Sequence, residues 1–247
     1  MLRDEIERHK IAAEKLEMIK NKAFEIIKRN LGKISEYDVS QFILSEFKKQ
    51  GLIIDEKYPA QIVAVTENSS IVHYFPKKRG SKIIKSDGLI LIDIWAKLKG
   101  DRSPFADITW MGYSGKNIPR EINRIFKIVI KARNFALKFI RENLKKKKFP
   151  KTKKVDKKVR NYFKKFGLEK YFPHGIGHSL GFSRCHGSYF RFSKKSQAKI
   201  KLGIPFTIEP GLYFKNRFGI RSEINCYITK DYKLIITTKI QKEIIKL

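Results

Sequence analysis

The sequence has few cysteines and few acids, and it has no long apolar run. Its 247 residues include two cysteines, and its 24 acids stand against 55 lysines and arginines, which gives a net charge of +31. Two cysteines cannot form a disulfide framework, so we expect both to be reduced. No segment reaches the roughly 20 apolar residues of a membrane helix. The start, Met1–Ile6, alternates charge without an apolar signal core, so we expect a cytoplasmic protein with no membrane partner.

The excess of positive charge has two interpretations. A net charge of +31 attracts polyanions at low salt, so nonspecific affinity for nucleic acid is one of them. However, the lysines are spread along the whole chain, and no basic stretch carries the interleaved aromatic residues of a base-stacking platform. We favour a general compositional bias, and we expect the lysine-rich stretch 145–154 to be a solvated loop.

The spacing of apolar residues predicts an α+β domain. Helical spacing covers residues 2–31, a second helix follows Ser35, and further helices start at Pro119 and cover 155–166. Ser35 and Asp38 have the spacing of a capping box. Strand-like runs lie at 61–65, 89–95, 105–111, 204–214, 218–229 and 234–237. The order of helices, strands, helices and strands predicts one compact domain, 1–247, whose two halves are related by internal pseudo-symmetry.

Acids beside apolar runs and a cluster of histidines mark the candidate site. Three of the five histidines fall within thirteen residues, at His174, His178 and His186. A carboxylate in an apolar strand is costly to bury unless it is paired or binds metal, and four acids have this context: Asp93, Asp107, Glu209 and Glu223. These acids and one imidazole form an oxygen-rich ligand set suited to two divalent cations. Such cations can lower the pKa of a bridging water and polarise a carbonyl.

Two residues compete with this set. Asp101 lies in the tip of the predicted hairpin and is the alternative to Asp107, although the Asp-Ile-Thr context favours Asp107. Cys185 stands beside His186, but one soft thiolate among four carboxylates is a poor match.

The motifs resemble those of the pita-bread metallopeptidases, peptidase family M24, which include methionine aminopeptidase, aminopeptidase P, prolidase and creatinase. The resemblance is specific over residues 60–229 and rests on the segments 155–181, 208–213 and 219–223. It implies the pita-bread fold in a catalytic domain without the separate N-terminal domain of prolidase. It also implies two divalent metals, Mn, Co, Fe or Zn, with Mn favoured, and it implies the metal ligands Asp93, Asp107, His178, Glu209 and Glu223.

The resemblance implies roles for further residues. Glu209 would shuttle a proton from water to the leaving amine, and His73 and His186 would be substrate-side histidines, His186 donating to the substrate carbonyl. His174 matches the first histidine of a prolidase-type His-x-x-x-His and would also face the substrate. Arg221 is suited to clamp a substrate carboxylate or to brace the ligands. Two spacings depart from the family: the Asp93–Asp107 hairpin is three residues longer, and His186 lies one residue farther from His178.

The residues found in these motifs favour the Xaa-Pro branch of the family. We predict a dinuclear-metal exopeptidase that hydrolyses the N-terminal bond of short peptides, before proline, by attack of a metal-bridging hydroxide. Methionine aminopeptidase is the alternative enzyme, but that branch usually lacks a histidine at the position of His174. A non-catalytic pita-bread module that binds protein or RNA is the other class, although such relatives usually lose several ligands. A homodimer is compatible with each of these interpretations.

Overall fold

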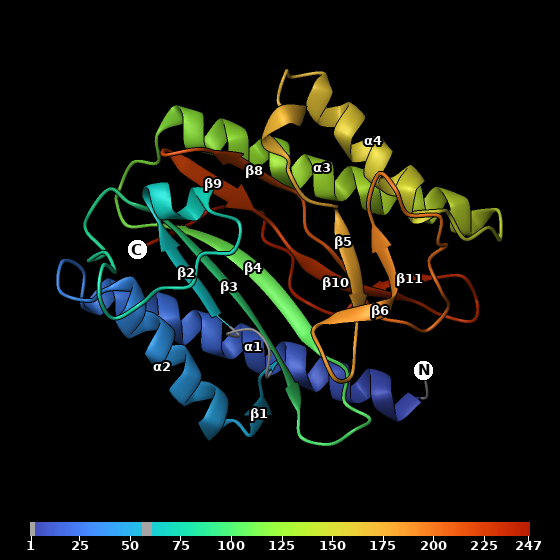
Figure 1. The fold of residues 1–247 in the computed structure, drawn as a ribbon, viewed down its shortest axis with the longest axis horizontal. Coiled ribbons are helices and arrows are strands. Elements are labelled where there is room, and N and C mark those ends of the chain that lie inside the picture. The colour runs from blue at the N-terminus through green and yellow to red at the C-terminus, as the bar shows by residue number, and fades with distance from the viewer. Residues whose placement is uncertain (1–2, 56–60) are drawn as a thin grey trace.

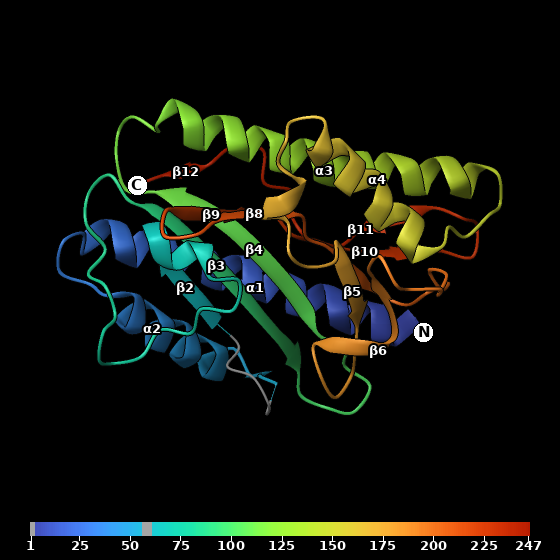
Figure 2. The same cartoon turned by 45° about the horizontal axis from the view of Figure 1, so that its top comes forward.

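Each half of the chain begins with a pair of helices and continues into strands (Figure 1). The computed structural model describes residues 3–55 and 61–247. The helices are α1 (Arg3–Arg29) and α2 (Glu36–Lys49) in the first half, and α3 (Arg120–Lys145) and α4 (Thr152–Lys164) in the second. In both views α1 and α2 lie on one side of the strands and α3 and α4 on the other (Figure 2). This mixed, layered arrangement confirms the predicted α+β class.

Local signals fix the helix ends. The Ser35 side chain accepts from the Asp38 N–H, and Asp38 accepts from the Ser35 N–H, so the predicted capping box is confirmed. α1 buries its apolar face, including Leu16, Ala23 and Ile27, against the first sheet. No helix within residues 3–55 and 61–247 is both long enough and apolar enough to cross a membrane.

The first sheet carries the predicted hairpin. Its strands are β1 (Leu52–Ile53), β2 (Gln61–Val65), β3 (Leu89–Leu98), β4 (Ala106–Tyr113) and β12 (Ile245–Lys246). Their order is β1-β3-β4-β12, and β2 pairs with β3. β3 and β4 are antiparallel, with Asp93 opposite Thr109 and Trp95 opposite Asp107. Asp93 therefore lies in the middle of a ten-residue strand, which starts at the predicted residue 89 and continues past the predicted end at 95 to Leu98.

The second sheet has the order β11-β10-β7-β5-β6, and β8 and β9 form a separate ribbon. The strands of this sheet and of the ribbon are β5 (Gly177–Leu180), β6 (His186–Phe192), β7 (Phe206–Ile208), β8 (Gly211–Phe214), β9 (Phe218–Arg221), β10 (Ile224–Ile228) and β11 (Leu234–Ile236). Short 3-10 turns lie at η1 (Thr66–Ser70) and η2 (Glu169–Tyr171).

Two predicted long strands are each divided in the structure. The run 204–214 splits into β7 and β8 around Glu209 and Pro210, and the run 218–229 splits into β9 and β10 around Ser222 and Glu223. The breaks occur because the chain changes partners there: the Ser222 N–H bonds to the Pro210 carbonyl, and the Glu223 N–H bonds to the Thr109 carbonyl. Both glutamates therefore stand where the chain passes from one sheet to another.

Candidate metal centre

The β3–β4 hairpin supplies two carboxylates to one face of the first sheet. Side chains two residues apart on a strand share a face, so the pairs Asp93–Thr109 and Trp95–Asp107 place both aspartates on the same face, diagonally across the hairpin. Asp93 is 6% exposed and Asp107 is 5% exposed. Asp101 is exposed in the hairpin tip, so the geometry favours Asp107 in this pair.

β5 presents His178 to these acids with a defined tautomer. The His178 Nδ1 lies 3.1 Å from the Ser179 carbonyl oxygen, which can only accept, so Nδ1 carries the proton. The lone pair on Nε2 then faces the acids, 3.7 Å from Asp107 Oδ2 and 3.4 Å from Glu209 Oε1. A histidine whose second nitrogen is held in this way is suited to bind a metal. Glycine is required at Gly177, because a Cβ there would lie 2.2 Å from the Thr207 carbonyl oxygen.

The two glutamates complete the group from the strand breaks. One ligand atom each of Asp107, His178 and Glu223 lie within 4.8 Å of one another. Glu223 Oε2 accepts from the Thr109 hydroxyl at 2.7 Å. Glu209 Oε1 accepts from the Thr207 hydroxyl at 3.2 Å. The structure therefore brings together acids that are more than a hundred residues apart in the sequence.

Three buried carboxylate oxygens test whether this group fits a cation. Asp93 Oδ1, Asp107 Oδ1 and Glu223 Oε1 have no hydrogen-bond partner in the described part of the chain. Burial, and then repulsion between the acids, raises the pKa of Asp107 and of Glu223 well above the usual range. Buried acids without donors are costly unless a cation compensates them. The donor set of carboxylates and one imidazole fits hard or borderline divalent metals.

Arg221 holds one edge of the centre. It is 3% exposed and forms an ion pair with Asp93. Its Nε donates to the Thr109 hydroxyl at 3.0 Å, and Nη1 donates to the Tyr213 hydroxyl at 2.9 Å. One oxygen of Asp93 is thus fixed while the other stays without a partner. The alternative of bracing the ligands, raised from the sequence, fits these contacts.

The two substrate-side histidines lie at the exposed edge of this group. His186 is exposed on β6, and its ring centroid is 3.9 Å from that of His178. Desolvation lowers the pKa of His186 to about 4, so its ring is neutral at pH 7. His73 is also exposed, and the neighbouring Val72 carbonyl accepts from Arg221 Nη1 at 3.3 Å. Contact of either histidine with a substrate stays a prediction.

His174 has both ring nitrogens occupied within the protein. Its Nδ1 donates to the Gly175 carbonyl at 2.8 Å, so its Nε2 accepts from the Tyr213 hydroxyl at 2.9 Å. Desolvation, then the charge of Arg221, lowers the pKa of His174 to about 3. Through Tyr213, His174 is linked to Arg221 and so to Asp93. A substrate contact of His174 stays a prediction, and it would require one of these bonds to be exchanged.

Sequence reasoning gave no role to several residues that support the ligands. The Asn225 side chain bonds both the N–H and the carbonyl of Asp107, at 2.9 and 2.6 Å. Arg160 pairs with buried Asp156 at 2.8 Å and donates to the Phe172 and His174 carbonyls, so it braces the loop before His178. The sequence showed the Asp156–Arg160 pair through its four-residue spacing on a predicted helix and through its place in the segment that resembles the family.

Cys185 lies closer to the centre than its chemistry suggested. Its Sγ donates to Asp107 Oδ2 at 3.1 Å, and its N–H donates to Asp55 Oδ2 at 3.0 Å. Burial, and then the nearby Asp107 charge, raises the thiol pKa well above its usual range. Cys185 is therefore a protonated donor to a candidate ligand. Both cysteines are free, in line with the expectation that they are reduced, and both are buried.

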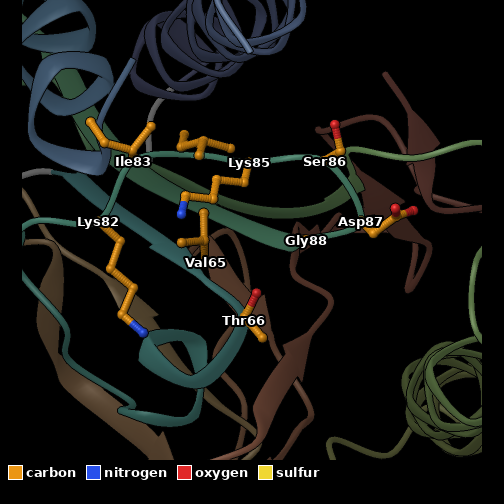
Figure 3. A pocket seen from close by; sticks show the side chains of 9 residues that line it. Val65, Thr66, Lys82, Ile83, Lys85, Ser86, Asp87 and Gly88 are labelled. Carbon is orange, nitrogen blue, oxygen red and sulfur yellow. The ribbon is translucent and has the colours of Figure 1, made fainter. Parts of the chain in front are cut away.

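A separate hollow of about 430 Å³ lies beside β2 and the start of β3 (Figure 3). Its lining runs over Val65–Thr66 and Lys82–Gly88, and it includes none of the predicted site residues. Lys82 forms an ion pair with Glu67 of η1. This hollow is unrelated to the metal centre.

A comparison with models of protein families identifies the family of this chain. Residues 7–230 match the model of metallopeptidase family M24. The chain belongs to this family.

Relatives support the family and the pita-bread fold. YkvY of Bacillus subtilis is 30% identical over 204 residues, which cover 83% of this chain and 52% of the relative. The prolidase of Thermococcus sibiricus superposes with a TM-score of 0.81 at 26% identity, over 100% of this chain and 62% of the other. A dipeptidase of Pyrococcus horikoshii gives 0.81 and 26%, over 100% and 63%. The chain thus spans about half to two thirds of the length of these relatives.

Proposed function

We propose that this protein is a dinuclear-metal exopeptidase that cleaves the N-terminal bond of short peptides whose second residue is proline. The observation that carries the proposal is the convergence of Asp107, His178 and Glu223, together with buried oxygens of Asp107 and Glu223 that have no hydrogen-bond donor among the described residues. The Thermococcus sibiricus relative at 26% identity is a prolidase. Its name supports the preference for proline.

Five side chains would hold the metals: Asp93, Asp107, His178, Glu209 and Glu223. When bound, two divalent cations supply the Lewis acidity that activates water and polarises the scissile carbonyl. Manganese is the metal that the family resemblance favours. Thr109 would keep Glu223 oriented by its hydrogen bond to the carboxylate, and Asn225 would hold the backbone of Asp107 by bonding both its N–H and its carbonyl.

Glu209 would move the proton. It is less buried than the other acids, with 16% of its side chain exposed, and the Thr207 hydroxyl orients its Oε1. This position lets Glu209 accept a proton from the attacking water and deliver it to the leaving nitrogen. As in any peptide bond, the leaving nitrogen must be protonated before the amine can leave, and in a Xaa-Pro bond this nitrogen belongs to the proline ring.

The histidines at the exposed edge would orient the substrate. His186 is neutral at pH 7 and exposed beside His178, so it can donate an N–H to the carbonyl oxygen of the scissile bond as charge develops there. His73, which follows η1, would contact the substrate from the first half of the chain, whereas His186 belongs to the second half. Arg221 is committed to Asp93, Thr109 and Tyr213, so we assign it to bracing.

A peptide panel tests the proposal. The purified protein, treated with EDTA and then given Mn²⁺, should cleave Xaa-Pro dipeptides and longer Xaa-Pro peptides, with EDTA alone abolishing cleavage. Faster cleavage of Met-Ala peptides than of Met-Pro peptides would place the protein in the methionine aminopeptidase branch. Absence of any metal-dependent hydrolysis would favour the non-catalytic module.

A further inference from the structure

The junction of α3 and α4 forms a hollow lined by lysines. The hollow has a volume of about 460 Å³, and five of its lining residues are Lys147, Lys148, Lys151, Lys154 and Lys199. Segment 145–158 holds nine lysines and a single acid, Asp156, which is buried and paired with Arg160. No carboxylate lines the hollow among the described residues. The lysines therefore repel one another and favour an anionic occupant.

A row of aromatic rings continues from this hollow along the two helices. The rings of Phe135 and Tyr162 are stacked, with centroids 5.9 Å apart and planes at 28°. Tyr162 meets Phe166 edge to face at 5.3 Å. The Lys158 ammonium lies 5.5 Å from the Phe139 ring centroid. Phe135 is 39% exposed and Phe166 is 47% exposed, which is unusual for rings of this size.

Helix geometry makes the hollow and the rings one continuous surface. Residues four apart lie on one face of a helix, so Lys154, Lys158 and Tyr162 form one row on α4 and Asn143, Phe139 and Phe135 form the facing row on α3. Phe166 lies in the turn after α4 and extends the first row through its contact with Tyr162. Asn143 and Lys154 also line the hollow. We call these seven residues, together with the other lysines of the hollow, Lys147, Lys148, Lys151 and Lys199, the α3–α4 seam. The two helices lie side by side on the outside of the molecule in both views (Figures 1 and 2).

The seam has the dimensions of a short oligonucleotide site. The 13 residues of α4 extend over about 20 Å, which is enough for several nucleotides. The sequence did not reveal this surface, because its lysines and rings come together only through the four-residue spacing of side chains on two different helices.

We propose that the α3–α4 seam binds single-stranded nucleic acid, with the lysines of the hollow contacting phosphates and the exposed rings stacking on bases. Cations together with accessible aromatic faces are the two elements of a single-strand site. A duplex keeps its bases stacked inside and would leave the rings unused. An acidic polypeptide would use only the lysines.

Charge reversal tests the phosphate contacts. The probe is a fluorescent 12-nucleotide oligouridine, titrated by anisotropy from 50 to 300 mM salt. The triple variant Lys147→Glu, Lys148→Glu, Lys154→Glu should bind about tenfold more weakly or worse at 150 mM salt. Its dependence of log K on log salt should fall by about 2, because each lost single-strand phosphate contact removes about 0.7 from the slope.

A matched triple variant distinguishes contacts at the seam from general attraction by the net positive charge of the molecule. Lys28→Glu, Lys33→Glu, Lys48→Glu changes the net charge by the same amount at exposed lysines of the first half. This control should keep its affinity within about threefold. An equal loss in both triples would show that the whole molecular charge attracts the oligomer, and it would overturn the proposal.

Ring substitution tests the base contacts. Phe135→Leu with Phe166→Leu keeps apolar packing between the helices but removes both exposed rings. Because stacking on one ring changes affinity by about tenfold, this variant should bind the oligonucleotide at least about tenfold more weakly. Its affinity for heparin, a polyanion without bases, should be unchanged. Circular dichroism checks that the fold is retained.

Three results would contradict the seam as a nucleic-acid site. Equal binding of the ring variant and the parent to oligouridine would exclude stacking. Tighter binding to heparin or to an acidic polypeptide than to oligouridine would indicate a general polyanion surface. Stronger binding to phosphatidylserine vesicles at the same salt would indicate a membrane surface. Peptidase activity does not enter any readout, so failure here leaves the proposed function intact.

Discussion

Asp107 and Asp156 are both buried aspartates, yet their surroundings differ. Asp156 has a partner on each oxygen, because Oδ2 accepts from Arg160 Nε at 2.8 Å and Oδ1 accepts from the Ile176 N–H at 3.2 Å. Asp107 has only the weak Cys185 thiol on Oδ2 and no partner on Oδ1. The fully bonded acid supports the loop that precedes His178, whereas the acid with an unpartnered oxygen lies among other candidate ligands.

The contrast shows how a structure separates supporting acids from ligating ones. A buried carboxylate oxygen without a donor costs on the order of 1–3 kcal/mol or more. A fold can tolerate several such oxygens in one place when a bound cation compensates them. The burial of an acid alone therefore says little about its function. The places where buried carboxylate oxygens lack hydrogen-bond donors are more informative.

The largest expected effect concerns the acid assigned to proton transfer. Glu209→Gln should lower turnover of Xaa-Pro substrates by about 10²- to 10⁴-fold, because the amide cannot accept the proton of the attacking water. Steady-state kinetics in Mn²⁺ measure the loss, and circular dichroism checks the fold. Glu121→Gln, at an exposed ion pair with Arg217, serves as the control and should retain full activity. Substantial turnover by Glu209→Gln would remove Glu209 from this role.

Paired variants test directly whether the two aspartates have different roles. Asp156→Asn should cost about 3–5 kcal/mol of unfolding free energy, with or without metal, because it removes the buried partner of Arg160 and leaves only the partly exposed Glu169, 3.3 Å from Arg160 Nη1. Asp107→Asn should cost much less in metal-free protein, since it relieves repulsion among the acids, but it should abolish the stabilisation by Mn²⁺.

Denaturant unfolding in EDTA and in Mn²⁺ measures both variants. Equal losses in EDTA, or a full Mn²⁺ response in Asp107→Asn, would show that the missing partner has no relation to metal binding.

His9 extends the comparison to a fully bonded group outside the centre. Its Nδ1 donates to the Phe105 carbonyl at 2.9 Å, and its Nε2 accepts from the Thr237 hydroxyl at 2.8 Å. Burial lowers the pKa of His9 from 6.5 to about 4. Below pH 6.5 the unfolded chain therefore binds a proton that the native state does not, and stability falls until about pH 4. The loss is about 3 kcal/mol.

Equilibrium unfolding between pH 7 and pH 4 measures this contribution. His9→Gln removes the titrating group, so the variant should lose less stability than the parent over this interval. Identical pH profiles for the two proteins would contradict the assignment.

The smallest expected effect concerns the hydrogen bond by which Cys185 positions Asp107. Cys185→Val removes the thiol donor with little change in volume, and it should weaken Mn²⁺ binding by about tenfold, a loss typical of supporting hydrogen bonds around metal ligands. Cys185→Ser restores a donor and should bind Mn²⁺ close to the parent. Titration calorimetry gives both affinities. Equal weakening by valine and serine would assign Cys185 to packing instead of to positioning Asp107.

The sequence was most informative where function depends on local patterns. The capping box at Ser35, the strand Gln61–Val65 and the β3–β4 hairpin follow from apolar spacing and turn residues, and the structure has them close to the predicted bounds. The five candidate ligands could be named because each acid interrupts an apolar run or follows a recognisable motif.

The remaining features depend on contacts between distant segments. The strand breaks at Glu209 and Glu223 arise from bonds to other sheets, which no local pattern encodes. β5 and β6 lie in a segment rich in glycine and polar residues, which has a weak strand pattern. The link from His174 through Tyr213 to Arg221 and the α3–α4 seam each join residues of separate elements, so the sequence alone could not predict them.

Anomalous diffraction from crystals grown with Mn²⁺ tests the central claim most directly. Two peaks at a spacing of roughly 3.5–4 Å, within coordination distance of Asp93, Asp107, His178, Glu209 and Glu223, are the predicted result. No peak among these side chains at saturating Mn²⁺, or a peak bound by other residues, would contradict it.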